Sequence, residues 1–302
     1  MDERRRGTVY GAAAHGCWGL FPLYWSHTAP ASAVEVLAHR VVWSLLVVAV
    51  LVVVGRRGAA VRAVVADRGR LRKLTGAAVL IAINWVTYIY GVTSGHVVET
   101  SLGYFANPIV TVLLAVVVLG ERLRPLQWTA IGAAVTAVVV LSVQGGHPPW
   151  IALILAFSFG SYGLLKKTAA VGAVEGLAVE TAVLAPLAVV FLIGLQVTGH
   201  GTAVAHGPAH FGWLMGAGVV TAIPLLLFGA AATRVPLATL GVLQYLTPSM
   251  QFVIGITVFG EPLPLLRLVG FALVWFGLVL FTIDVLRERG RPVTVATVAE
   301  LV

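Results

Sequence analysis

The feature that most constrains this chain is a succession of long apolar stretches, which leave almost no polar surface for water. Ten stretches cover residues 8–26, 34–54, 74–93, 99–119, 126–144, 149–166, 176–197, 210–230, 238–259 and 265–285. About twenty apolar residues in a helix cross the hydrocarbon core of a bilayer. Charged residues make up only 11% of the chain, against about 25% in soluble domains. The sequence therefore predicts an all-α integral membrane protein with ten transmembrane helices.

The positions of the basic residues predict its orientation. With ten spans, both termini lie on one side, together with the loops after the second, fourth, sixth and eighth spans. All of the 20 Lys and Arg residues except Arg40 and Arg267 fall on that side. Because cytoplasmic loops carry an excess of Lys and Arg, we expect both termini in the cytoplasm. The net charge of +8 then reflects loop charges, which form no continuous basic face of the kind that binds nucleic acid.

The two halves of the chain resemble each other at an offset of 140 residues. The matching pairs are Glu35 with Glu175, Gly76-Ala77 with Gly216-Ala217, Ala82-Ile83 with Ala222-Ile223, Pro108 with Pro248, and Gly120-Glu121 with Gly260-Glu261. Each half would hold five helices, so the second half would enter the membrane upside down. Inverted repeats are typical of transporters that work by alternating access, with the substrate bound near the midplane. We expect a first repeat at 1–144, a second at 145–286 and a disordered cytoplasmic tail at 287–302.

Several motifs resemble those of the RarD proteins, in the EamA branch of the drug/metabolite transporter superfamily. They are Leu37–Ser44, Asn84-Trp85, Glu99–Pro108, Gly120–Arg122, Ala156–Phe159 with Tyr162–Leu164, Ala230–Arg234 and Leu240-Gly241. The resemblance runs from about residue 8 to residue 285. It implies two EamA repeats and a bacterial inner-membrane location. The family is named for a link to chloramphenicol sensitivity, and the resemblance does not define a physiological substrate. The loop after the second span and the tail beyond Arg289 fit the family pattern least.

Three polar residues stand close together in the second span. Glu35 and His39 are four residues apart and share a helix face, and Arg40 lies near the same side. A charge at the centre of a membrane helix costs roughly 2.5–3.5 kcal/mol, so it needs water or a partner. Arg40 would grip an anionic group of a substrate, or it would pair with Glu35 or extend to the membrane surface. His39 is a candidate substrate or proton site, or a hydrogen-bonded structural residue.

Glu180 occupies the position of Arg40 in the second half. It is a candidate proton-coupling carboxylate, as is Glu35, or a counter-charge to Lys166 or Lys167. The sequence leaves these alternatives open.

Asn84, Trp85 and Tyr88 share one face of the third span. One amide flanked by aromatic rings suits a binding pocket with few polar groups. The alternative is a hydrogen bond between helices with ordinary packing.

Pro108 and Pro248 occupy matching positions in the fourth and ninth spans. Each removes a backbone donor, and paired interruptions in corresponding helices point to a transporter's central site. Tyr104 and Asn107 precede Pro108, and Gln244 and Tyr245 precede Pro248, so all four are substrate-binding candidates. The alternative is a kink needed only for packing. Glu121 and Glu261 are interpreted as turn residues that cap the helix following each of them.

The chain shows no sign of catalysis. It contains no HExxH, GxSxG or Walker motif, so an enzyme and direct ATP drive are not supported. No cofactor is predicted, and three scattered histidines in the 198–210 loop predict no metal site. The sequence favours a secondary transporter of a small solute such as a drug, an amino acid or another metabolite, with proton-coupled efflux as one mode. A channel or a structural membrane protein is the alternative. The expected partners are the solute and the lipid bilayer, and a homodimer is left open.

Overall fold

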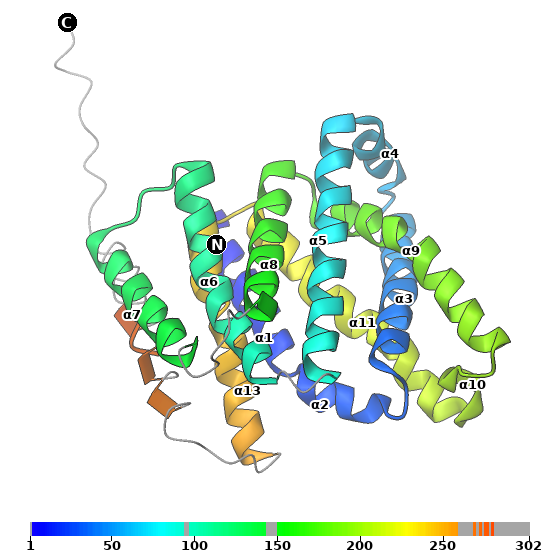
Figure 1. Cartoon of the computed structure of the whole chain (residues 1–302). Coiled ribbons are helices and arrows are strands. Elements are labelled where there is room, and N and C mark those ends of the chain that lie inside the picture. Colours follow the sequence, from blue (N-terminus) through cyan, green and yellow to red (C-terminus); the bar gives the residue numbers. More distant parts are fainter. Residues whose placement is uncertain are drawn as a thin grey trace, which may run out of the picture.

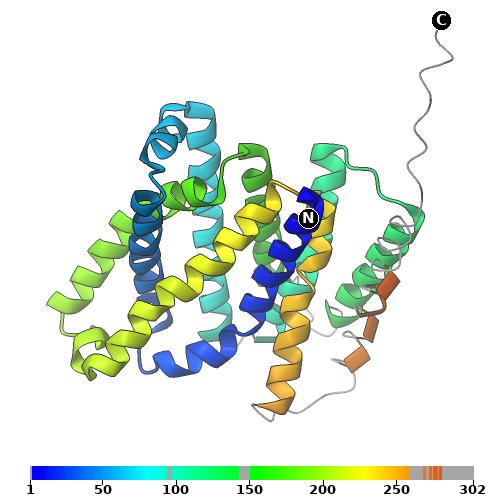
Figure 2. The same ribbon diagram turned by 180° about the vertical axis from the view of Figure 1, so that it is seen from behind.

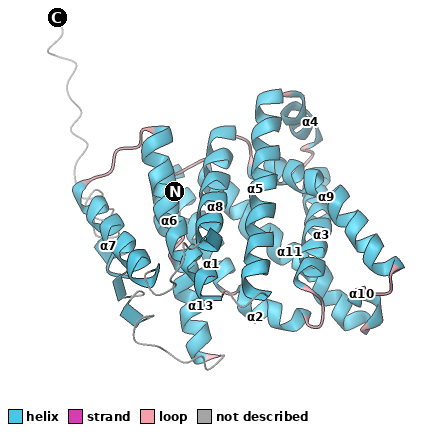
Figure 3. Cartoon of the chain, in the orientation of Figure 1, coloured by secondary structure: helices cyan, strands magenta, loops and turns pink. Residues whose placement is uncertain are grey.

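The computed structural model describes residues 2–93, 97–142 and 150–258, with short pieces at 268–269, 272–273, 275–277 and 279–280. All regular structure in these ranges is helical (Figure 3). The helices of the first part are α1 (Glu3–Gly19), α2 (Phe21–Trp25), the 3-10 turn η1 (Ser26–Thr28), α3 (Ala33–Val54), α4 (Gly58–Ala66), α5 (Arg68–Thr93), α6 (Val97–Leu119) and α7 (Pro125–Ser142). The second part holds α8 (Trp150–Ala169), α9 (Ala173–Val197), α10 (Thr202–Ala205), α11 (Gly207–Ala232), α12 (Leu237–Leu243) and α13 (Leu246–Thr257).

The first nine apolar stretches coincide with these helices to within a few residues, and most of the tenth lies outside the described residues. By length and composition, α3, α9 and α11 are each long and apolar enough to cross a membrane. Large apolar side chains point outward, such as Val117 (79% exposed) and Leu187 (75% exposed). An exposed apolar surface of this kind suits lipid and not water. The complete ten-helix, two-repeat arrangement stays a prediction.

Two stretches that were predicted as single spans are broken. The stretch 8–26 divides at Leu20 into α1 and α2, and Pro22 stands at the start of α2. The stretch 238–259 divides at Gln244 and Tyr245. Because Pro248 has no N–H to give to the Gln244 carbonyl, that oxygen instead accepts the Thr247 N–H at 3.2 Å.

The helix interruption expected at Pro108 is not seen, because α6 continues through this residue. At this point α12 lies very close to α6. A β-carbon on Gly241 would stand 3.1 Å from the Pro108 carbonyl oxygen. The paired prolines therefore mark a meeting point of α6 and α12, although only the second lies beside a break.

The most extensive helix contacts join the first part of the chain to the second. They are the pairs α6–α8, α5–α8, α3–α9, α3–α11 and α1–α11. Figures 1 and 2 show α6, α8 and α5 standing side by side, with α1 and the oblique α11 behind them in Figure 1 and in front of them in Figure 2. Small residues permit the closest approaches; at Gly218 in α11, an added β-carbon would collide with Trp43 Cβ. The two parts thus interleave around a common interior.

Candidate functional site

A cavity of about 230 Å³ lies where α1, α3, α5, α6 and the α12–α13 break meet. Aromatic and polar side chains make up most of its wall. The aromatic ones are Trp18, Phe21, Trp25, Trp85, Tyr88, Tyr104 and Phe159. The polar ones are His15, Arg40, Asn84, Asn107, Gln244, Thr247 and Gln251. An apolar wall with a few placed polar groups is typical of small-molecule sites.

Arg40 is the one Lys or Arg in this wall, and aromatic rings surround it. The guanidinium carbon lies 4.4 Å from the ring centre of Trp85 and 4.9 Å from that of Trp25, both within cation–π range. Arg40 Nε donates to Thr221 Oγ1 at 2.8 Å. Among the described residues, no carboxylate lies within ion-pair distance of Arg40, and none lines the cavity. In the described part of the chain, the site therefore presents a positive charge without an acidic partner.

The local pairing of Glu35 with Arg40 is not seen. Glu35 lies in the first turn of α3, where Ser32 Oγ accepts the Glu35 N–H at 3.2 Å. Its side chain is buried and accepts the backbone N–H of Thr202 at 2.7 Å. Glu35 thus holds the start of α10 and does not pair with Arg40.

Two of the nine predicted substrate residues do not line the cavity. His39 lies next to Arg40 on α3 but turns away, and its Nδ1 accepts from Trp43 Nε1 at 3.1 Å. Tyr245 is buried, and its hydroxyl has no hydrogen-bond partner in the described part of the chain. Consecutive residues of a helix point about 100° apart, so the neighbour of a cavity-lining residue can face elsewhere, as His39 does beside Arg40.

Asn84 combines both roles that its position suggested. Its amide nitrogen donates to the Leu155 carbonyl and to Ser158 Oγ, both at 3.0 Å, which ties α5 to α8. It also lines the cavity beside Trp85 and Tyr88. The ring centres of Tyr88 and Tyr104 are 5.7 Å apart in an edge-on arrangement.

The α12–α13 break supplies the polar end of the cavity. The Gln244 amide nitrogen donates to Thr111 Oγ1 at 3.1 Å. The Thr247 hydroxyl donates to the His15 carbonyl at 3.0 Å and lies 3.2 Å from His15 Nδ1. The Thr247 hydroxyl has one proton, which it donates to the His15 carbonyl. The His15 imidazole must therefore act as the donor to Thr247, through Nδ1.

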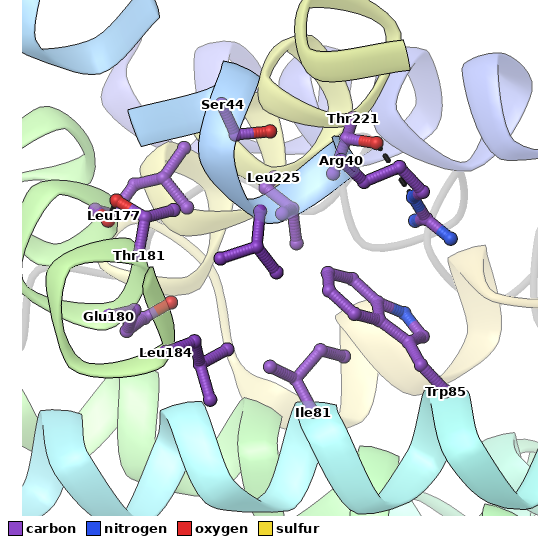
Figure 4. Close-up of a pocket in the computed structure, with 11 residues that line it drawn as sticks. Arg40, Ser44, Ile81, Trp85, Leu177, Glu180, Thr181, Leu184, Thr221 and Leu225 are labelled. Carbon is purple, nitrogen blue, oxygen red and sulfur yellow. Dashed lines mark hydrogen bonds between the residues drawn. The ribbon is translucent and has the colours of Figure 1, made fainter. Parts of the chain in front are cut away.

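Glu180 forms a buried ion pair with Lys166. Glu180 Oε1 lies 2.6 Å from Lys166 Nζ, and the Tyr162 hydroxyl donates to the other carboxylate oxygen at 3.3 Å. The counter-charge that the sequence allowed is therefore present, and proton coupling at Glu180 or Glu35 stays a prediction. Glu180 and Arg40 line a second, smaller pocket of about 20 Å³, where Leu184, Ile81 and Trp85 lie between them (Figure 4).

Sequence reasoning missed the contribution of the first apolar stretch, 8–26, which forms α1 and α2. His15, Trp18, Phe21 and Trp25 all line the cavity, and the aromatic spacing of three and four residues could have shown that they share a face. No comparable sequence pattern pointed to Thr221, the residue that accepts the hydrogen bond from Arg40. In the described residues, no group of three or more His, Cys, Asp or Glu side chains could hold a metal ion.

Glu121 does not cap the helix that follows it. Its carboxylate accepts the N–H groups of Leu237 at 2.9 Å and Ala238 at 3.1 Å, so it caps α12 in the other part of the chain. A carboxylate at a helix N-terminus satisfies donors that have no partner within the helix. The corresponding Glu261 lies outside the described residues.

Comparison with known proteins agrees with this architecture. A protein named RarD from Streptomyces exfoliatus is 49% identical, over 96% of this chain and 92% of its own length. RarD from Escherichia coli (strain K12) is 38% identical over 96% and 99%. An uncharacterized transporter from Pseudomonas aeruginosa is 42% identical over 95% and 96%. A solved crystal structure shares the fold, with a TM-score of 0.67 and 19% identity over 93% of this chain and 98% of that one.

The model of the EamA-like transporter family matches residues 5–143. These matches confirm the resemblance found in the sequence motifs. The chain belongs to the EamA-like transporter family alongside the RarD proteins, and is a multi-pass membrane transporter of the drug/metabolite transporter superfamily.

Proposed function

We propose that the protein is a secondary transporter that moves a small anionic or zwitterionic solute across the bacterial plasma membrane, with the central cavity as the solute site. The observation that carries this proposal is Arg40, which lines the cavity without a carboxylate partner among the described residues. An unpaired guanidinium attracts carboxylate or phosphate groups strongly. A drug, an amino acid or another metabolite with such a group would satisfy its charge.

The aromatic wall supports an amphipathic solute. Trp25 and Trp85 lie beside the Arg40 guanidinium, and Thr221 occupies its Nε. Among the described residues no hydrogen bond engages the terminal Nη groups, so they are available to a solute, whose anionic oxygens would approach along the edge of the guanidinium plane. The apolar body of the solute would then contact the rings of the wall.

The transport mechanism follows from the repeat. Two inverted five-helix repeats, 1–144 and 145–286, would exchange outward-open and inward-open arrangements around a fixed site. The 140-residue offset and the one-sided distribution of Lys and Arg support this topology, with both termini in the cytoplasm. Glu180 and Glu35 remain the proposed groups for proton coupling.

Flux into proteoliposomes tests the proposal. Wild-type protein should show saturable counterflow of at least one member of a panel of carboxylates, amino acids and antibiotics. Arg40→Ala should reduce that flux at least tenfold, whereas Arg234→Ala, which removes a cation outside the cavity, should leave it within twofold. Normal flux by folded Arg40→Ala would refute the proposal that Arg40 binds the anionic group of the solute. Conductance without counterflow would indicate a channel, and no flux of any solute would favour a structural role.

The topology has a separate test. Reporter fusions should place the N-terminus and the C-terminus on the same, cytoplasmic side. Fusions that report opposite sides would exclude the inverted repeat.

A further inference from the structure

The segment 56–73, here called the basic platform, carries seven of the chain's Lys and Arg residues and one acid, Asp67. The platform begins just after the end of α3, where the exposed apolar surface of that helix stops. Val53 and Val54 are 75% and 77% exposed and are suited to lipid, and the exposed Arg56 follows after Gly55. The change from exposed valines to arginine within two residues puts the platform at the level of the lipid headgroups.

Some of its charges already have partners in the protein. Arg57 pairs with Glu175 at 2.8 Å, and Arg70 with Asp67 at 3.4 Å. Lys73 Nζ donates to the Thr168 carbonyl at 2.8 Å.

Arg56, Arg62 and Arg68 are exposed, and among the described residues no acidic side chain lies within ion-pair distance of them. Three guanidinium groups are therefore exposed on one short segment without counter-charges in the part of the chain that the structure describes.

The platform is a folded element and not a loose loop. α4 packs on α5 and α9 through the buried Val64, and Figure 1 shows it set across the end of α5. Asp67 Oδ1 accepts the N–H groups of Gly69 and Arg70 at 2.9 and 3.0 Å, which fixes the turn into α5. These contacts hold in place α4, which carries Arg62, and the start of α5, which carries Arg68.

We propose that the basic platform binds the headgroups of anionic phospholipids, through the phosphodiesters of lipids such as phosphatidylglycerol. Guanidinium groups form paired hydrogen bonds with phosphate oxygens, and clusters of basic residues next to a membrane helix favour anionic lipid. The charge bias of loops requires basic residues on this side, but it requires neither a folded α4 nor unpaired arginines at headgroup depth.

The test uses the full chain in nanodiscs of phosphatidylcholine, with and without phosphatidylglycerol. The variant Arg56→Gln/Arg62→Gln/Arg68→Gln is compared with the control Arg4→Gln/Arg5→Gln/Arg122→Gln, which removes three exposed cations elsewhere. Thermal unfolding and native mass spectrometry report lipid-dependent stabilisation and lipid retention. Phosphatidylglycerol should stabilise the wild type and the control. The platform variant should lose most of this gain and retain the lipid roughly a hundredfold more weakly, given the contribution of each of the three basic residues.

Equal responses of the platform variant and the wild type would overturn the proposal. So would an equal loss in the control, which would show that only total charge matters. Stabilisation of the phosphatidylcholine sample by free glycerol phosphate, or displacement of bound lipid by an RNA oligonucleotide, would assign the surface to a different ligand and also overturn it. If the triple variant does not fold, Arg62→Gln alone is measured in the same way, because Arg62 has no acidic partner to lose among the described residues.

Discussion

The buried pair of Lys166 and Glu180 gives the sharpest test of how this interior is stabilised. Both side chains are almost fully enclosed, with exposed fractions of 4% and 3%. The two charges are 2.6 Å apart, and the Tyr162 hydroxyl contacts the second carboxylate oxygen. Replacing Glu180 by Leu would leave an ammonium group in a nearly water-free space.

The expected cost follows from that burial. Removing one partner of a buried pair costs about 3–5 kcal/mol, because the remaining charge has no compensation. Replacing both partners by apolar residues of similar size is often close to neutral. Glu180→Leu and Lys166→Leu should therefore each lower the unfolding temperature by roughly 10 °C, on the scale of domains of this size. The double variant should recover most of the loss.

Thermal unfolding of the purified protein in detergent measures all four forms. Glu175→Leu is the matched control, because Glu175 stands on the same helix but pairs with Arg57, which is 49% exposed. Partly exposed pairs contribute about 0–1 kcal/mol, although the buried Glu175 side chain adds a packing change. If the two single variants were as stable as the wild type, or if their losses simply added in the double variant, the pair would not stabilise the fold as inferred.

Two further predictions concern close helix contacts. Gly218→Ala should destabilise the protein by about 1–3 kcal/mol, as overpacking does, because the new methyl group would meet Trp43. Gly212→Ala on the same helix meets nothing within 4 Å and should be neutral or stabilising in the same thermal assay; equal effects would contradict the packing argument. Glu121→Ala should cost about 1–2 kcal/mol as a lost helix cap, and hydrogen exchange at Leu237 and Ala238 should accelerate. Unchanged exchange there would show that Glu121 does not cap α12.

Much of this protein was readable in its sequence because membrane helices are local structures. Every backbone polar group in lipid must be satisfied within the helix, so a long apolar stretch predicts its own conformation. Arg40 stood out for the same reason, since a cation inside such a stretch requires a partner or a cavity. Asn84 could be proposed from the aromatic residues on its helix face, and Tyr104 and Gln244 from the paired prolines that they precede, and all three line the cavity.

The sequence did not determine which side chain of each neighbouring pair faces the cavity, or which distant group it meets. Arg40 lines the cavity and His39 does not; Gln244 lines it and Tyr245 does not. Glu180 meets Lys166, Glu35 meets the start of α10, and Glu121 caps a helix more than a hundred residues away. These outcomes depend on the rotation of each helix and on how closely its neighbours approach, through glycines such as Gly218 and Gly241. Hydropathy fixes where a helix lies along the chain, whereas the packing of interleaved helices decides what its side chains touch.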